Sequence, residues 1–202
     1  MYTDVIIAGF GGQGVLLIGN LLAYAAMEQG LEVTFMPVYG VEMRGGTANC
    51  TVVVSDREIG SPIVLSPVSL ISMNQPSLEK FQPCLQDGGI QIVNSSLANA
   101  GAVDSQRVRS LLLPANEIAS ELGSAKMANM VALGAWVRAT GAMPLDAVQN
   151  CMDKVVSPRN HHLIPRNQEA VQAGADFAAR REAQPVSAAE GSARRPDSGR
   201  PR

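Results

Sequence analysis

The run DVIIA at residues 4–8, followed at once by GFGGQG at residues 9–14, decides the fold. The first run is rich in β-branched residues and has no polar alternation, which is typical of a strand covered on both faces. Residues 15–29 then carry apolar side chains at helical spacing, and Gly30 stands where a helix would end. Residues 31–36 (LEVTFM) predict a second strand. The sequence therefore opens on a strand, a glycine turn, a helix and a second strand parallel to the first.

The rest of the chain continues to mix strand and helix patterns. Further strands are predicted at residues 47–55, 59–64, 89–94 and 108–113. The second of these is expected to pair back on the first as an antiparallel hairpin, across a turn at residues 56–58. Helices are predicted at residues 77–84, 115–122, 129–141, 144–155 and 167–181. We therefore expect an α/β fold, a three-layer α/β/α Rossmann-like sandwich with a mostly parallel sheet and an antiparallel hairpin.

Composition indicates one domain and excludes several functions. The chain has 202 residues, 46% apolar, 17% charged and 4% aromatic, with a net charge of −2. These values disfavour the stacking and phosphate-backbone modes of nucleic-acid binding. Residues 180–202 hold six arginines against three acidic residues, which leaves 10 basic and 15 acidic residues in the remainder. Because that terminal segment has almost no large apolar side chains, we expect a domain at residues 1–179 and a disordered basic tail at residues 180–202.

The number and spacing of the cysteines indicate the cellular compartment and limit which metal cofactors this chain could hold. Cys50, Cys84 and Cys151 are far apart and form no C-x-x-C pair, so no locally encoded zinc or iron–sulfur site is expected. An odd number of cysteines without a signal peptide predicts a reducing cytoplasm. The apolar stretch at residues 15–26 is too short to span a bilayer and is interrupted by Asn20, so no membrane association is expected.

The glycine turn is the first candidate site. A G-x-G-x-x-G spacing between a strand and a helix suits a phosphate cradle, because the helix N-terminus offers free N–H donors. The alternative is a tight turn that binds no ligand. An acidic residue at the end of the second strand is missing, as is a P-loop lysine, which disfavours NAD binding and nucleoside triphosphate hydrolysis. The candidate ligand-binding residues here are Gly9, Gly11, Gly12, Gln13 and Gly14.

A second loop, YGVEMRGG at residues 39–46, is expected on the same carboxyl edge of the sheet. Its arginine lies beside two glycines, an arrangement that suits an anion. The alternative is a solvated loop with one ion pair. The candidate residues of this loop are Tyr39, Glu42, Arg44, Gly45 and Gly46. No nucleophile–base pair or carboxylate pair stands out anywhere in the chain, so no catalytic residue is assigned.

Three motifs in this order carry a family resemblance. GFGGQG (9–14), YGVEMRGG (39–46) and SDREIGSP (55–62) together resemble the gamma subunit of 2-oxoacid:ferredoxin oxidoreductases, and later motifs that begin at Asn129 and Asn167 are similar too. The resemblance covers about residues 3–178. It implies a subunit of a complex that oxidatively decarboxylates a 2-oxoacid with thiamine diphosphate, reduces ferredoxin and releases an acyl-CoA.

The resemblance also implies a division of labour. Thiamine diphosphate, magnesium and iron–sulfur clusters would belong to partners: the alpha and beta subunits, with a ferredoxin-like delta subunit as a further candidate. This chain would help to bind coenzyme A at the active-site entrance, or its glycine turn would face the thiamine-binding subunits. Among the possible 2-oxoacids, 2-oxoglutarate is favoured. The competing hypotheses are a stand-alone Rossmann-like nucleotide-binding or regulatory module and a purely structural scaffold.

Overall fold

The computed structural model describes residues 1–39 and 46–183 of the chain. Its strands are β1 (Tyr2–Phe10), β2 (Glu32–Tyr39), β3 (Thr47–Ser55), β4 (Ser69–Ser72), β5 (Ile90–Asn94) and β6 (Arg109–Leu113). Its α-helices are α1 (Val15–Glu28), α2 (Gln75–Phe81), α3 (Ala115–Glu121), α4 (Ala128–Thr140), α5 (Leu145–Asn150), α6 (Met152–Val155) and α7 (Ile164–Ala183). Short 3-10 turns are η1 (Gln82–Cys84), η2 (Ala100–Ala102), η3 (Ala125–Met127) and η4 (Pro158–Leu163). No helix in these described ranges is long and apolar enough to cross a bilayer.

The six strands form one sheet in the order β2-β3-β1-β4-β5-β6. Strands β1, β4, β5 and β6 pair in parallel, whereas β3 is antiparallel to both β1 and β2. The prediction of a mostly parallel sheet with an antiparallel part is confirmed, but the antiparallel partners of β3 are β1 and β2 and not residues 59–64. The second strand, however, does not lie beside the first. Strand β3 lies between them. It is rich in β-branched residues, has a neighbouring strand on each edge and buries side chains on both faces of the sheet.

The strand predicted at residues 59–64 is wrong. That segment has no strand structure and most of its residues are exposed. Both edges of β3 are already paired, with β1 on one side and β2 on the other, so no edge is free to accept a further strand. Pro62 in addition lacks the N–H that a ladder needs. The chain instead returns to the sheet at β4, which pairs in parallel with β1.

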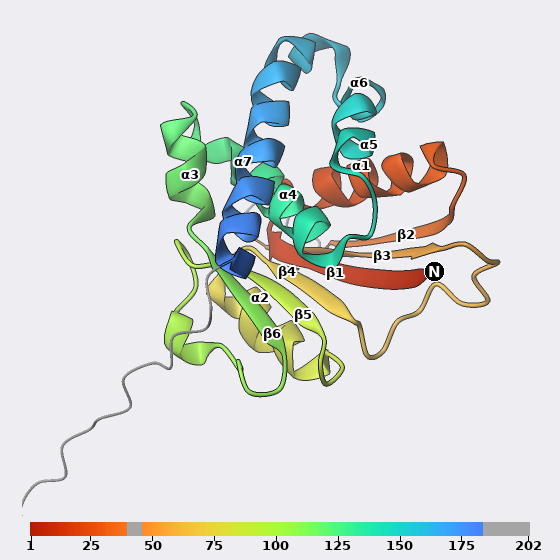
Figure 1. Ribbon diagram of the computed structural model, residues 1–202, viewed down its shortest axis with the longest axis vertical. Helices are drawn as coiled ribbons and strands as arrows, with labels where there is room; N and C mark the ends of the chain where they lie inside the picture. Colours follow the sequence, from red (N-terminus) through yellow and green to blue (C-terminus); the bar gives the residue numbers. More distant parts are fainter. Residues whose placement is uncertain (40–45, 184–202) are drawn as a thin grey trace, which may run out of the picture.

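Helices cover both faces of the sheet, as the three-layer prediction requires. Figure 1 shows α1, α4, α5, α6 and α7 on one side of the sheet and α2 on the other. The larger core lies under the first group and includes Ile7, Ile18, Leu22, Val52 and Trp136. A smaller cluster on the α2 face includes Ile6, Ala8, Leu70 and Leu85. This burial of apolar surface on both faces of the sheet is the main source of stability.

Helices α4 and α7 approach each other closely through glycine. A Cβ added to Gly134 would lie 1.8 Å from the carbonyl oxygen of Val171, and one added to Gly174 would lie 1.9 Å from that of Val131. Only glycine allows this approach. On the sheet side of α4, the fully buried Trp136 donates its indole N–H to the hydroxyl of Ser69 at 2.9 Å.

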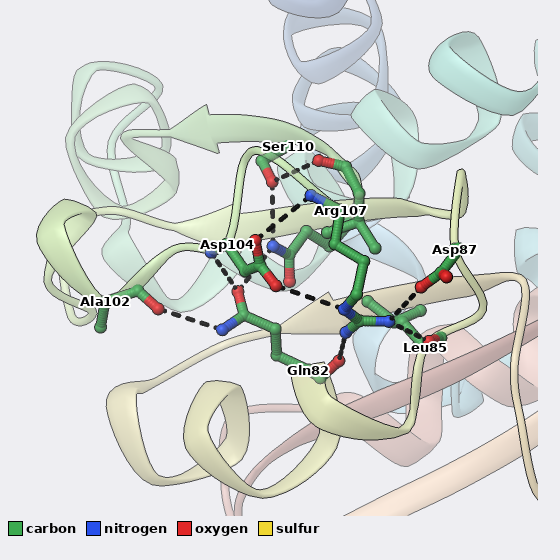
Figure 2. A network of polar contacts seen from close by, with 9 residues as sticks. Gln82, Leu85, Asp87, Ala102, Asp104, Arg107 and Ser110 are labelled. Atoms are coloured by element: carbon green, nitrogen blue, oxygen red, sulfur yellow. Dashed lines mark hydrogen bonds and ion pairs between the residues drawn. The ribbon is translucent and has the colours of Figure 1, made fainter.

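A polar network joins the segment before β6 to η1 and the residues that follow η1 (Figure 2). The guanidinium of Arg107 donates to the carbonyls of Leu85 and Gln82 and pairs with Asp104 at 3.2 Å and Asp87 at 3.3 Å. The side chain of Gln82 donates to the Ala102 carbonyl and accepts from the Asp104 amide. Because these groups satisfy Arg107 internally, its charge supports the fold and is not offered to a ligand.

Candidate functional site

The glycine turn and the end of the second predicted loop meet at one edge of the sheet. The amide of Gly11 donates to the carbonyl of Gly46 at 2.8 Å, and Tyr39 at the end of β2 pairs with Ala48 of β3. The Gly11–Gly46 hydrogen bond and the Tyr39–Ala48 pairing both arise because β3 runs antiparallel to β1 and β2 and lies between them. Glu42, Arg44 and Gly45, also predicted for this site, lie outside the described residues.

The turn itself is shaped by left-handed backbone. Gly12 has φ of 101° and Gly14, which caps α1, has φ of 72°. A Cβ added to Gly12 would meet no atom of the described residues within 4 Å, so these residues leave the space beside it open. Helix α1 has no side-chain cap and no acidic residue in its first turn. The positive end of its dipole therefore lies at the turn without a compensating carboxylate from α1, which favours an anion nearby.

Gln13 fixes the turn to the end of β4. Its side-chain oxygen accepts from the Phe10 amide at 2.6 Å and from the Asn74 side chain at 2.8 Å. Its side-chain nitrogen donates to the Met73 carbonyl at 3.3 Å. Asn74 in turn caps α2 by accepting from the amide of Ser77 at 3.0 Å. Gln13 therefore positions the turn through contacts with the protein.

Two further asparagine contacts complete this edge. Asn94, the last residue of β5, donates to the Met73 carbonyl at 3.2 Å and to the side-chain oxygen of Asn116 at 2.9 Å. Asn129, near the start of α4, donates to the carbonyl of Gly14 at 3.3 Å. A Cβ on Gly14 would lie 2.3 Å from that side-chain nitrogen of Asn129. The turn is thus held between β4 on one side and α4 on the other.

A cavity of about 210 Å³ opens beside the turn. Its lining residues are Gly12, Gln13, Met73, Asn116, Ala125, Lys126, Ala128 and Asn129. Among the described residues, Lys126 is the one charged residue that lines this cavity, and no described carboxylate does. Amides, an open glycine turn and one ammonium group form an environment that suits a phosphate or another hydrogen-bonding anion.

The predicted and observed sites overlap only in part. Sequence reasoning found the turn but missed Asn74, Asn94, Asn116 and Lys126, and it noted Asn129 only as part of a family motif. Asn74 and Asn94 lie at or just after the carboxyl ends of parallel strands, where ligands bind in open α/β sheets, and that signal would have found them.

The described part of the chain contains no metal-binding cluster of His, Cys, Asp or Glu. Its three cysteines are free, and only Cys84 is exposed. Burial raises the pKa of the Cys50 thiol to about 12, so this side chain stays protonated at neutral pH. The site as described can bind and orient an anion, and it presents no nucleophile–base pair of its own.

Comparison with known proteins identifies the family. Residues 4–177 match the family model described as pyruvate ferredoxin/flavodoxin oxidoreductase. The chain belongs to this family. It is 41% identical over 176 residues to the ketoisovalerate oxidoreductase subunit VorA of Methanothermobacter thermautotrophicus, covering 86% of this chain and 36% of VorA. The chain therefore spans little more than a third of that family member. It is also 35% identical over 183 residues to the 2-oxoglutarate synthase subunit KorC of Methanothermobacter marburgensis, covering 88% of this chain and 97% of KorC.

Solved structures of family members share the fold. The gamma subunit of a keto/oxoacid ferredoxin oxidoreductase from Geobacter sulfurreducens matches with a TM-score of 0.75 and 27% identity, over 88% of this chain and 99% of that one. The 2-oxoglutarate:ferredoxin oxidoreductase of Magnetococcus marinus, solved with 2-oxoglutarate, coenzyme A and succinyl-CoA bound, matches with a TM-score of 0.79 at 21% identity. That match covers 89% of this chain and 31% of the Magnetococcus chain, and it shows a common fold.

Proposed function

We propose that this chain is the gamma subunit of a 2-oxoacid:ferredoxin oxidoreductase and that it acts only within the complex. The complex would oxidatively decarboxylate a 2-oxoacid, transfer the acyl group to coenzyme A and pass the electrons to ferredoxin. The observation that carries this proposal is the family match over residues 4–177, supported by the similarity to nearly the whole length of KorC. The candidate anion site, with no nucleophile–base pair among the described residues around it, supports a role within a larger complex.

The proposed substrate class is the 2-oxoacids. The sequence favoured 2-oxoglutarate, and the relatives named above include both a ketoisovalerate and a 2-oxoglutarate enzyme subunit. These two acids differ in charge and shape: one carries a second carboxylate and the other a branched apolar side chain. A comparison of their kcat/KM values in the complex distinguishes them directly.

Within the complex, we assign this chain the binding of coenzyme A phosphate groups at the carboxyl edge. The open turn at Gly12 and the start of α1 would receive a phosphate, and Lys126 would offset its charge. Arg44, predicted from the second loop, would add a bidentate contact. Bound coenzyme A supplies the thiol that accepts the acyl group. Thiamine diphosphate, magnesium and the iron–sulfur clusters belong, in this proposal, to the alpha and beta subunits and a ferredoxin-like delta subunit.

Steady-state kinetics of the reconstituted complex test this assignment. Lys126→Ala and Arg44→Ala should each raise the KM for coenzyme A about tenfold, which corresponds to one lost charge-assisted contact, and leave the KM for the 2-oxoacid unchanged. Arg159→Ala, which removes an exposed cation on η4, is the matched control and should change neither constant. Equal changes in both constants would indicate an assembly role for this edge, and no change would place coenzyme A elsewhere.

A further inference from the structure

A second groove lies at the amino ends of the parallel strands, opposite the glycine turn at their carboxyl ends. It is formed by the amino ends of β5 and β6 and the last turns of α4 and α7, and we call it the amino-edge groove. A cavity of about 520 Å³ in it is lined by Ile90, Arg109, Ser110, Leu111, Ala139, Ala178, Arg181 and Glu182. A neighbouring cavity of about 400 Å³ shares Ile90, Arg109 and Ala139. Pockets that hold ligands have roughly 300–1,000 Å³.

The charged groups of the amino-edge groove are held in place by other parts of the chain. Arg109 donates to the carbonyl of Ala139 at the end of α4. The guanidinium of Arg181 stacks over the ring of Phe177, with its central carbon 5.4 Å from the ring centre. Glu182 pairs with Arg138 at 3.2 Å. Within the described ranges, neither Arg109 nor Arg181 has a carboxylate within ion-pair distance.

The position of β6 makes the groove accessible to another polypeptide. It is the last strand in the sheet order, and one of its edges has no neighbouring strand among the described residues. Arg109 is exposed, and Ser110 and Leu111 are half-buried. The remaining wall is apolar, formed by Ile90, Leu111, Ala139 and Ala178. An extended segment can therefore lie along β6 with an apolar side chain against this wall.

The charges on the groove indicate which polypeptide fits. Residues 184–202 of this chain begin next to Ala183, at the end of α7, but they contain four arginines and two acidic residues. Such a segment is repelled by Arg109 and Arg181. A segment with carboxylates beside a large apolar side chain is attracted instead.

We propose that the amino-edge groove binds an extended acidic segment of a partner subunit. Carboxylates of that segment pair with Arg109 and Arg181, and an apolar side chain between them packs against the half-buried Ile90 and Leu111. The proposal rests on the proposed function, since it needs a complex in which such a partner exists. It adds a contact surface at the amino ends of the strands, opposite the proposed coenzyme A site at their carboxyl ends.

Site-specific photo-crosslinking in the assembled complex tests the proposal. A photoreactive p-benzoylphenylalanine replaces Arg180, an exposed residue next to the groove, and in a control it replaces Glu169, an exposed residue earlier in α7. Mass spectrometry identifies the crosslinked peptide. We expect position 180 to crosslink to a partner subunit at a segment with Asp or Glu beside a large apolar residue, and position 169 to give no crosslink to that segment. A crosslink to residues 184–202, to a second copy of this chain, or to nothing overturns the proposal.

Charge variants give an independent readout. Arg109→Glu combined with Arg181→Glu should weaken binding to the partner subunits at least about tenfold and abolish the crosslink. Arg109→Lys combined with Arg181→Lys should retain most of the affinity, and equal melting temperatures of the two variants exclude a folding defect. Arg57→Glu, at a cation that is 90% exposed, should bind like the wild type. If the wild-type complex forms and turns over but the double Glu variant binds normally, the groove proposal fails and the proposed function stands. If no complex forms at all, both fail.

Discussion

Replacing Gly14 with alanine probes how the glycine turn is held against α4. Gly14 has φ of 72°, and an added Cβ would lie 2.3 Å from the side-chain nitrogen of Asn129. Gly30 has nearly the same φ, 71°, and nothing lies within 4 Å of its added Cβ. The two glycines therefore form a matched pair. Both require left-handed backbone, but only Gly14 also requires empty space.

The structure sets the expected magnitudes. Placing alanine in left-handed backbone costs about 1–2 kcal/mol, which is the whole effect expected for Gly30→Ala. At position 14 the methyl group must also displace Asn129, which is 5% exposed and donates to the Gly14 carbonyl at 3.3 Å. Leaving a buried amide without its partner costs about 1–3 kcal/mol more. We therefore expect Gly14→Ala to lower the free energy of unfolding by about 2–5 kcal/mol.

Urea unfolding of the full chain, followed by circular dichroism, measures both variants. In an Asn129→Ala background the obstructing side chain is gone, so adding Gly14→Ala should cost only the conformational part, about 1–2 kcal/mol. If Gly14→Ala destabilises no more than Gly30→Ala, or if its cost is the same with and without Asn129, the proposed contact between the turn and α4 is refuted.

Three further predictions follow from packing and burial. Gly134→Ala should lower the free energy of unfolding by about 3 kcal/mol, because the methyl group would collide with the Val171 carbonyl, and thermal melting measures this. Iodoacetamide should alkylate the exposed Cys84 and spare Cys50, whose pKa burial raises to about 12; peptide mass spectrometry reads the outcome, and equal labelling would contradict it. Burial raises the pKa of the Asp4 carboxyl in the folded state above its value in the unfolded chain. Below the unfolded-state pKa this shift has no effect on stability. As pH rises through the folded-state pKa, ionisation of Asp4 destabilises the folded state. Asp4→Asn should therefore improve stability, relative to wild type, more at neutral pH than at about pH 4 in urea titrations, and an identical effect at both would contradict the account.

Local patterns in the sequence predicted local structure well. The strand at residues 47–55 has the bounds of β3, and the strand–glycine turn–helix motif forms as expected at the start of the chain. These features depend on neighbouring residues: β-branched side chains, glycine spacing and helical periodicity. The order of the strands depends on long-range pairing. A pattern at residues 4–36 cannot reveal that β3 will lie between β1 and β2, and that insertion is also why β3 has no free edge for residues 59–64.

The same limit applies to the candidate site. The glycine turn is encoded within six residues, so its spacing alone predicted it. Asn129 is 115 residues away from Gly14 in sequence, and only the packing of α4 against the turn brings the two together. Lys126 reaches the same cavity because η3 leads directly into α4. The loop containing Arg44 lies outside the described residues, so its role remains a prediction from sequence.

A non-autonomous gamma subunit has no turnover of its own, and one activity measurement on the chain and its partners can establish this. The thiamine-binding partner subunits are purified with and without this chain, and 2-oxoacid- and coenzyme A-dependent reduction of ferredoxin is measured for each preparation and for the chain alone. The account predicts turnover only when the chain and its partners are combined. Turnover by the chain alone, or full acyl-CoA formation by the partners without it, would contradict the account.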